Sequence, residues 1–487
     1  MNAEPVVDYL LQRHDAVLGK LNAFLRLPSV STDPAYAEGM AAARSFLLDW
    51  LTGIGLSDVQ LLDGGGHPAV YGAWLGAPGA PTIIVYGHYD VQPPDPLALW
   101  RTPPFEPTIQ GGNLHARGAS DVKGSTTIAI ESVAGFLAVH GGCPVNIKLF
   151  LEGEEETGSP SLHEIVRRHG PLLEADAMIS ADGGRQSAIV PTINVGARGL
   201  TKLELIVRSA EKELHSGRYG GGVRNALHEL AAIIPSLHDE NGAIAIPALM
   251  AALPLPSPHD RRDAAALPFD EAAFVADVGG IAAGEPGYSL RERLTLRPAI
   301  DVNGMWGGYT GAGSKTVIPD EARAKITIRL APGQDPKQAL QALQDHIRSF
   351  ARPGVRITFA GVGAGAPAST LAGNHPLVQA ATRVLRRVWQ RDPIHVRLGA
   401  TVPITAIFKE LLDIDTLMFG LNLPDEDVHA PNEFFHIDSI VLGLRSWPLL
   451  LQELATFAPA EFRVRLGISW ARANPEAIPI PRNHKPL

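Results

Sequence analysis

The chain has 487 residues, of which 45% are hydrophobic and 19% charged, a composition typical of a globular protein with a large core. This length exceeds one ordinary folding unit and predicts two domains. With 51 acidic and 42 basic residues the formal net charge is −9, which argues against nucleic acid as a partner. The single cysteine, Cys143, excludes an intrachain disulfide and a thiolate-rich metal site.

Neither a membrane span nor a secretory leader is expected. The longest apolar candidate, around 440–451, is interrupted by Arg445 and Pro448 and falls short of the roughly 18 residues that a span needs. The first residues carry an acid and no basic leader. We therefore expect a soluble, cytoplasmic protein.

The first 195 residues predict a largely parallel sheet. Apolar residues at helical spacing predict helices over 5–27 and 36–53, the second ending at Gly53. Short apolar runs then alternate with helical patterns, as in a sheet with helices on both faces. We expect strands over 82–86, 145–151 and 177–180, and helices over 125–139 and 161–169.

The pattern changes near residue 195 and returns after about residue 373. Strands over 200–209, 322–330 and 355–360, with helices over 225–237 and 336–350, predict a small α+β module with one open sheet face. Residues 240–300 are weakly patterned. A helix over 377–389, a strand over 416–420 and a last helix over 436–457 resume the α/β pattern.

We therefore predict the α/β fold class, with a discontinuous catalytic domain and an insertion. Residues 1–195 and 373–487 would form the catalytic domain, and 196–372 the inserted α+β domain. The tail after Ala460, rich in proline and arginine, supports no prediction.

Histidine and acidic residues follow the predicted strands at the point where each strand ends. In an open parallel sheet, ligands bind beyond the carboxyl ends of the strands, so residues from separate segments are expected at one edge. The run Glu152–Glu156 would ordinarily be a solvated acidic surface, but here it directly follows an apolar strand. The side chains expected at this edge are His88, Asp90, Asp121, Glu155, Glu156, Asp182 and His429.

These residue types indicate bound divalent metal. Carboxylates that crowd together repel one another unless cations lie between them. Two imidazoles and several carboxylates without a thiolate suit zinc, manganese or cobalt. A pair of ions needs one bridging carboxylate and two further ligands each, and Glu155 would remain as a general base. The five predicted ligands are His88, Asp121, Glu156, Asp182 and His429.

Five motifs, in order along the chain, resemble those of the M20 family of metallopeptidases, in particular its dipeptidase-like branch. The resemblance spans roughly residues 5–457. It implies a zinc-peptidase catalytic domain with an inserted dimerisation or lid domain, and hence a homodimer. The motifs are GHYDVQP at 87–93, RGASDVKG at 117–124, EGEEETGS at 152–159, LHSG at 214–217 and SKTVIP at 314–319.

The resemblance also implies how the ligands are shared. One metal ion would be bound by His88 and Asp182 and the other by Glu156 and His429, with Asp121 bridging the two ions. Zinc is the expected metal, and manganese and cobalt are alternatives.

Further roles are implied for residues around the metals. Asp90 would hold the second nitrogen of His88, and Glu155 would deprotonate the water that bridges the metals and then protonate the leaving amine. His215 would stabilise the oxyanion, from its own subunit or its neighbour's. Arg329 would bind the substrate's free carboxylate with its planar guanidinium. Weaker matches suggest substrate contacts at Thr316, Gly399 and Ala400.

We expect hydrolysis of a short amide bond, most simply that of a dipeptide with a free C-terminal carboxylate. Asp182 favours the dipeptidase-like branch over deacylases that use glutamate there. However, Gly183 and Gly184, and the segment from Ile394 onward that contains Val396–Thr401, depart from the mammalian dipeptidases. An N-acyl-amino-acid amidohydrolase with the same mechanism is therefore an alternative, and a non-catalytic protein that binds metal and peptide is another.

Overall fold

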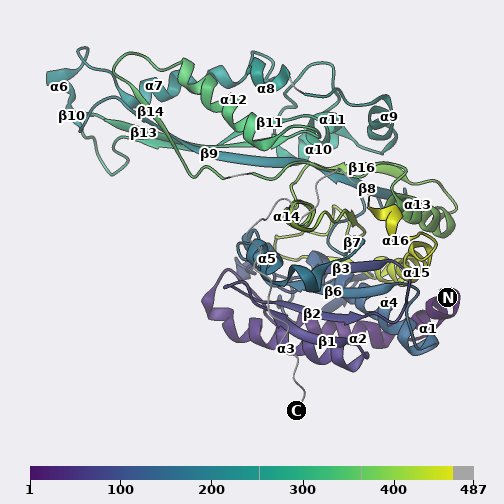
Figure 1. The fold of residues 1–487 in the computed structure, drawn as a ribbon. Coiled ribbons are helices and arrows are strands. Elements are labelled where there is room, and N and C mark those ends of the chain that lie inside the picture. Colours follow the sequence, from purple (N-terminus) through teal and green to yellow (C-terminus); the bar gives the residue numbers. More distant parts are fainter. Residues whose placement is uncertain (252, 364, 464–487) are drawn as a thin grey trace, which may run out of the picture. The chain divides into compact units, whose positions relative to one another are not determined.

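The computed structural model describes residues 1–251, 253–363 and 365–463 (Figure 1). The chain divides into two compact units, each built from separate stretches of sequence. Residues 1–185, 373–392 and 407 onward form unit 1, and residues 186–372 and 393–406 form unit 2. The segment 393–406, assigned from the sequence to the catalytic domain, belongs to unit 2 because its strand β16 (Ile394–Leu398) pairs with β8 (Thr192–Ala197). Most of the tail after Ala460 lies outside the described residues.

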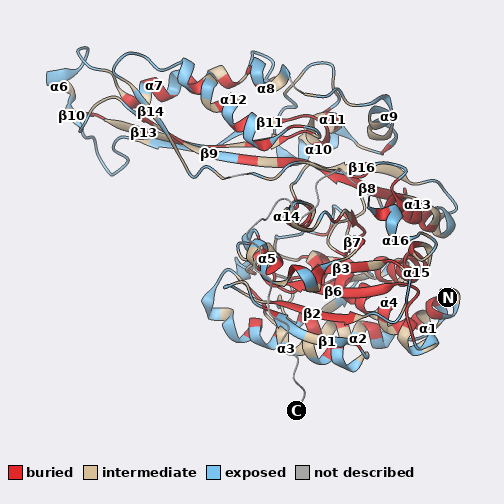
Figure 2. Ribbon diagram, viewed as in Figure 1, coloured by how far each residue is buried: buried red, intermediate tan, exposed pale blue. Residues whose placement is uncertain are grey.

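Unit 1 is built on a sheet with strand order β1-β2-β6-β3-β7-β17. Strands β6, β3, β7 and β17 are parallel, while β1 and β2 are antiparallel to their neighbours. Figure 2 shows β3 and β6 buried along almost their whole length, as expected for apolar strands covered on both faces. The strands are β1 (Ser57–Leu62), β2 (Ala69–Trp74), β3 (Thr82–His88), β6 (Asn146–Glu152), β7 (Ala177–Ser180) and β17 (Thr416–Met418).

Helices surround this sheet. The single helix predicted over 5–27 is two helices, because the backbone of Arg13 leaves the helical conformation. The helices of unit 1 are α1 (Glu4–Gln12), α2 (His14–Leu25), α3 (Ala37–Gly53), α4 (Gly124–His140), α5 (Leu162–Leu173), α13 (Pro376–Trp389), α15 (Ile437–Leu454) and α16 (Pro459–Phe462), with α14 (Pro403–Leu412) shared between the two units.

One helical run, Ala119–His140, is long and apolar enough by length and composition to cross a membrane, which is weak evidence for a span. Within its window, 72% of the residues are buried inside the molecule, and α4 packs against α1, α15 and β3. The run is therefore accounted for as a core helix.

A small antiparallel sheet joins two distant segments of unit 1. Its strand order is β18-β5-β4, and Phe434 pairs with His115. This pairing places the chain that follows β5 beside the chain that precedes β18. The strands are β4 (Thr108–Gln110), β5 (Asn113–His115) and β18 (Phe434–His436).

Unit 2 contains an antiparallel sheet of order β11-β13-β9-β14. Buried and accessible residues alternate along β9 and β13, and α7 and α12 pack against the buried face. This is the pattern of a sheet covered on one side. The elements are β9 (Gly199–Arg208), β11 (Ala299–Gly307), β13 (Glu321–Leu330), β14 (Arg356–Ala360), α7 (Ala226–Ile233) and α12 (Pro336–Ser349).

Apart from residue 252, which is not described, the weakly patterned stretch 240–300 contains four short helices and the first residues of β11. Short helices bury few residues and so leave a weak periodic signal, but Ser257 and Ser289 begin two of them with capping boxes. The remaining elements of unit 2 are α6 (Ser216–Tyr219), α8 (Pro247–Ala251), α9 (Pro258–Ala266), α10 (Glu271–Val278), α11 (Leu290–Thr295), β10 (Leu214–His215), β12 (Val317–Ile318) and β15 (Ser369–Thr370).

Candidate active site

The parallel strands of unit 1 deliver polar residues to one edge of the sheet. His88 is the last residue of β3 and lies in register with Glu152 at the end of β6. Glu155 and Glu156 form the turn after β6, and Asp182 follows β7. Asp121 lies in a turn just before α4. The peptide bond between Asp121 and Val122, within this turn, is cis.

The structure brings all five predicted ligands together, and we refer to them as the ligand group: His88, Asp121, Glu156, Asp182 and His429. They form two trios that share Asp121, and in each trio the candidate ligand atoms lie within 4.8 Å of one another. His88 Nε2 lies 3.2 Å from one Asp121 oxygen, and His429 Nε2 lies 2.9 Å from the other. A carboxylate between two imidazoles is the arrangement that a bridging ligand requires.

Protonation of the ligand group follows from this crowding. Hydrogen bonds to Asp121 and Glu156 raise the pKa of His429 to about 10. Burial, together with the negative charge of Asp121, raises the pKa of Asp182 to about 7. Burial opposes a charge on Asp121, but the hydrogen bonds from His429 and His88 bring its pKa well below the usual value. Without cations, the site is therefore neutralised by protons.

Divalent cations fit this donor set. Among the described residues, no lysine or arginine forms an ion pair with a carboxylate of the ligand group. The donors are imidazole nitrogens and carboxylate oxygens, which suit zinc, manganese and cobalt. Two ions would replace the protons that the site holds without metal.

Glu155 and Asp90 lie beside the ligand group. Burial and the nearby charges of Asp182 and Asp121 raise the pKa of Glu155 to about 9, although His88 opposes the rise. Asp90 is fully buried, and its Oδ1 lies 3.5 Å from His88 Nδ1, while its main-chain oxygen lies closer, at 3.0 Å. The main-chain oxygen is therefore the direct acceptor for His88 Nδ1–H, and the carboxylate supports it electrostatically.

His215 and Thr316 lie next to each other in unit 2. His215 pairs in register with Val317, and the carbonyl of Thr316 accepts a hydrogen bond from Ser216 N at 3.0 Å. Gly217 N–H donates to His215 Nδ1 at 3.0 Å, so the proton of the neutral ring is on Nε2. Within the described part of the chain, no group accepts a hydrogen bond from that N–H, so it can serve as a donor to a ligand.

Arg329 and the Gly399–Thr401 loop are also adjacent in unit 2. Arg329 Nη1 donates to Thr401 Oγ1 at 2.9 Å, and Thr401 Oγ1 donates to the carbonyl of Arg198 at 2.7 Å. Arg198 Nε in turn donates to the carbonyl of Gly399 at 2.8 Å. Three of the four predicted substrate-binding residues, Arg329, Gly399 and Ala400, therefore lie in one place, whereas Thr316 lies beside His215.

Sequence reasoning assigned no role to several residues that contact the ligand group. Gln92 Nε2 donates to Glu156 Oε2 at 2.8 Å, and Glu433 accepts hydrogen bonds from the backbone around Asp121. Gln92 lies within the motif at 87–93, so the sequence already indicated that it lies near the ligand group. Glu433 follows His429 by four residues, and only its burial distinguishes it from a surface acid.

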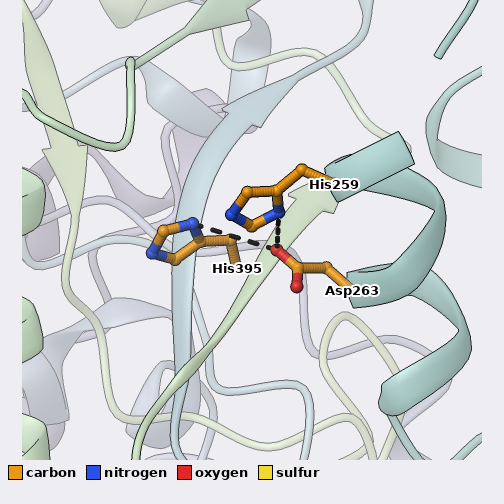
Figure 3. Close-up of side chains that lie close together, drawn as sticks. All are labelled: His259, Asp263 and His395. Atoms are coloured by element: carbon orange, nitrogen blue, oxygen red, sulfur yellow. Dashed lines mark ion pairs between the residues drawn. The ribbon is translucent and has the colours of Figure 1, made fainter. Parts of the chain in front are cut away.

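A second cluster of histidine and aspartate lies in unit 2 (Figure 3). Asp263 Oδ2 lies 3.0 Å from His259 Nδ1 and 3.9 Å from His395 Nδ1. The two rings are stacked with 6° between their planes, so their nitrogen lone pairs lie in parallel planes and do not converge on one point. The His259 side chain is 59% exposed. This geometry is that of an ion pair beside a stacked imidazole.

Comparison with known proteins identifies the family. The model of peptidase family M20/M25/M40 matches residues 84–453, which include every member of the ligand group. The chain belongs to this family. It is a metallopeptidase with the α/β architecture that its relatives share.

Three relatives illustrate the similarity of this M20 peptidase to known proteins. A Cys-Gly metallodipeptidase of Schizosaccharomyces pombe is 25% identical, over 94% of this chain and 100% of that protein. A Beta-Ala-His dipeptidase of Mus musculus is 29% identical, over 82% of this chain and 83% of that protein. The crystal structure of an M20 family metallo-carboxypeptidase from Sulfolobus solfataricus superposes with a TM-score of 0.78 at 30% identity, over 91% of this chain and 99% of that one.

Proposed function

We propose that this M20 peptidase is a metal-dependent dipeptidase that acts on short peptides with a free C-terminal carboxylate. The observation that carries the proposal is the convergence of the ligand group at one sheet edge, with Glu155 beside it. The two curated relatives named above are dipeptidases, and the similarity covers most of both chains.

The ligand group would hold two divalent cations. We assign His88 and Asp182 to one ion, Glu156 and His429 to the other, and Asp121 to both. Zinc is our first choice, with manganese or cobalt as alternatives. When bound, such ions polarise a substrate carbonyl and make water more acidic.

Glu155 would move the proton. Its carboxylate would take a proton from the attacking water as the water oxygen bonds to the carbonyl carbon, and would give it to the amine nitrogen as the C–N bond breaks. Burial raises the pKa of Glu155, which suits the first of these steps, the uptake of a proton. Asp90 would keep His88 oriented through its main-chain oxygen and carboxylate.

Residues of unit 2 would bind the rest of the substrate. The Nε2–H of His215 is a suitable donor to an oxyanion. Arg329 has a hydroxyl partner, Thr401, and among the described residues it has no carboxylate partner. Its guanidinium can therefore bind a substrate carboxylate with two hydrogen bonds. We include Thr316, Gly399 and Ala400 as substrate contacts.

Unit 2 would also form a homodimer. β11 is an edge strand of its sheet, and it exposes Val302, Met305 and Trp306. An exposed apolar edge strand is a favourable pairing surface for a second copy. We propose that the dimer acts in the cytoplasm, with which the single buried cysteine, Cys143, agrees.

Substrate class can be tested with purified protein loaded with zinc or manganese. A mixed pool of free dipeptides and N-acyl amino acids is incubated and followed by mass spectrometry. We expect dipeptides to disappear and N-acyl amino acids to remain. Loss of N-acyl amino acids alone would support the amidohydrolase alternative. The differences from the mammalian dipeptidases at Gly183–Gly184 and around Ala400 would then be the expected cause of the changed substrate class.

The role of Glu155 is tested with Glu155→Gln. Removing a general acid and base costs about 10²- to 10⁴-fold in rate, and we expect kcat to fall by that amount. Metal content, measured by mass spectrometry of the digested protein, should stay at two ions per chain because Glu155 is outside the ligand group. Unchanged turnover would contradict the assignment, and absence of turnover in the wild type would favour the non-catalytic alternative.

A further inference from the structure

A buried ion pair between Arg117 and Glu433 lies behind the loops that carry Asp121 and His429. Arg117 Nη1 is 2.8 Å from Glu433 Oε2, and each side chain is only 1% exposed. The two residues are 316 positions apart in the sequence, and neither belongs to the ligand group. The pairing of β5 with β18 brings the two segments together.

Glu433 binds the backbone of the Asp121 turn. Its Oε1 accepts hydrogen bonds from Ser120 N at 2.9 Å and from Asp121 N at 3.0 Å. Its Oε2 accepts one from Gly118 N at 2.9 Å, in addition to the bond from Arg117. Because three backbone donors within residues 118–121 bind one carboxylate, the main chain at Asp121 is held in one orientation.

Arg117 binds the loops on the other side of the site. Its Nη2 donates to the carbonyl oxygens of His429 and Pro93, each at 3.2 Å. His429 has a φ of 66°, a left-handed conformation that a residue other than glycine keeps only where its surroundings hold it. The guanidinium also stacks over Trp100 at 5.4 Å, which keeps it in place.

We propose that Arg117 and Glu433 are positioning residues that set the placement of Asp121 relative to His429. A buried ion pair is by itself weak evidence for stability, since apolar residues of similar size often serve as well. Here the pair makes five further hydrogen bonds to the main chain of three loops that carry or adjoin the ligands. The inference rests on the proposed function for the metal-binding role of Asp121 and His429.

Glu433→Gln tests the proposal. The amide keeps the size of the side chain but turns an NH₂ donor toward backbone N–H groups, so the turn must shift. We expect the affinity of the metal-free protein for Co²⁺, measured by competition with a chelator, to fall about 10- to 100-fold. The visible spectrum of bound Co²⁺ should change as well, and saturating Co²⁺ should restore most of kcat. Arg117→Lys keeps the positive charge but loses the planar guanidinium, whose two Nη atoms bind different partners. This variant should weaken Co²⁺ binding in the same way.

Asp176→Asn is the matched control. Asp176 is also a buried carboxylate paired with an arginine, Arg463 at 3.1 Å, and it accepts a hydrogen bond from Thr82 N at 2.8 Å. Asp176 immediately precedes β7, and its contact with Thr82 is at the start of β3, at the other end of that strand from His88. This variant should lose thermal stability but keep wild-type affinity for Co²⁺.

Two results would overturn the proposal. The first is that the Co²⁺ affinity and spectrum of Glu433→Gln are the same as those of the wild type. If circular dichroism shows that Glu433→Gln does not fold, the same result in Arg117→Lys would overturn the proposal. The second is an equal loss of affinity in Asp176→Asn, which would make the effect one of general stability. Both readouts are independent of peptide hydrolysis, so an error in the substrate class leaves the test intact.

Discussion

At the scale of single residues, the site is governed by competition between protons and cations. His429 is held in its protonated form by two acidic neighbours, Asp121 and Glu156, at 2.9 and 3.2 Å. An imidazole must lose this proton before it can bind a metal ion. The same neighbours that would complete the metal site therefore also resist its loading at low pH.

Metal uptake should release protons and become tighter as the pH rises. His429 has a pKa of about 10 in the metal-free protein, so at pH 7 it carries a proton that binding displaces. Between pH 7 and 10 we expect affinity to rise up to tenfold per pH unit from this residue alone. Calorimetric titration in buffers with different ionisation enthalpies measures the proton count. Heats that do not depend on the buffer would contradict this prediction.

At the scale of elements, the ligands are placed by close contacts between strand ends. Gly420, just after β17, lies against the chain that follows β7 and carries Asp182. A Cβ atom at position 420 would lie 1.8 Å from the carbonyl oxygen of Gly183 and 2.6 Å from that of Ala181. Both contacts are with backbone, which cannot rotate away as a side chain would.

Gly420→Ala should therefore displace the segment that carries Asp182. We expect a loss of about 1–3 kcal/mol in the free energy of unfolding, measured by urea denaturation, together with weaker metal binding. Gly19→Ala is a suitable control, since nothing lies within 4 Å of a Cβ atom there. In helix α2 the added methyl group should be neutral or stabilising. Equal stability of the two variants would show that the strand end is free to adjust.

The sequence allowed the ligand group to be predicted because strand ends are local signals. A buried apolar run followed at once by His88 or by the acids after β6 marks both the strand and the sheet edge. The Arg117–Glu433 pair has no such signal, since it depends on β5 meeting β18 across more than 300 residues. Strands β1 and β2 and helices α8 to α11 were also not predicted, because each is too short or too irregular to show a clear period.

At the scale of the whole molecule, the proposed dimer would depend on the exposed edge of unit 2. Trp306 is 42% exposed and Met305 51% exposed on β11. The ring of Trp306 has Lys325 Nζ 5.7 Å from its centroid. A single chain leaves this apolar edge in water, whereas a second copy would cover it.

Trp306→Glu should convert the proposed dimer to a monomer. The new carboxylate can pair with Lys325 in a single chain but would be buried in the interface of a dimer, which is costly. Light scattering coupled to size-exclusion chromatography should show half the mass of the wild type. Leu99→Glu, at a position 62% exposed in unit 1, should leave the mass unchanged. A wild-type mass equal to that of one chain would refute the dimer.

The unequal exposure of the two histidine ligands also has a kinetic consequence. The His88 side chain is fully enclosed, whereas that of His429 is 53% exposed. Exchange at the His429 position would be fast because water and chelators reach it directly, while exchange at the His88 position would wait for local opening of the chain. Removal of the ions by a chelator would then follow two exponentials, with half-loaded molecules accumulating between them. Refilling such molecules with another metal would yield defined mixed-metal forms.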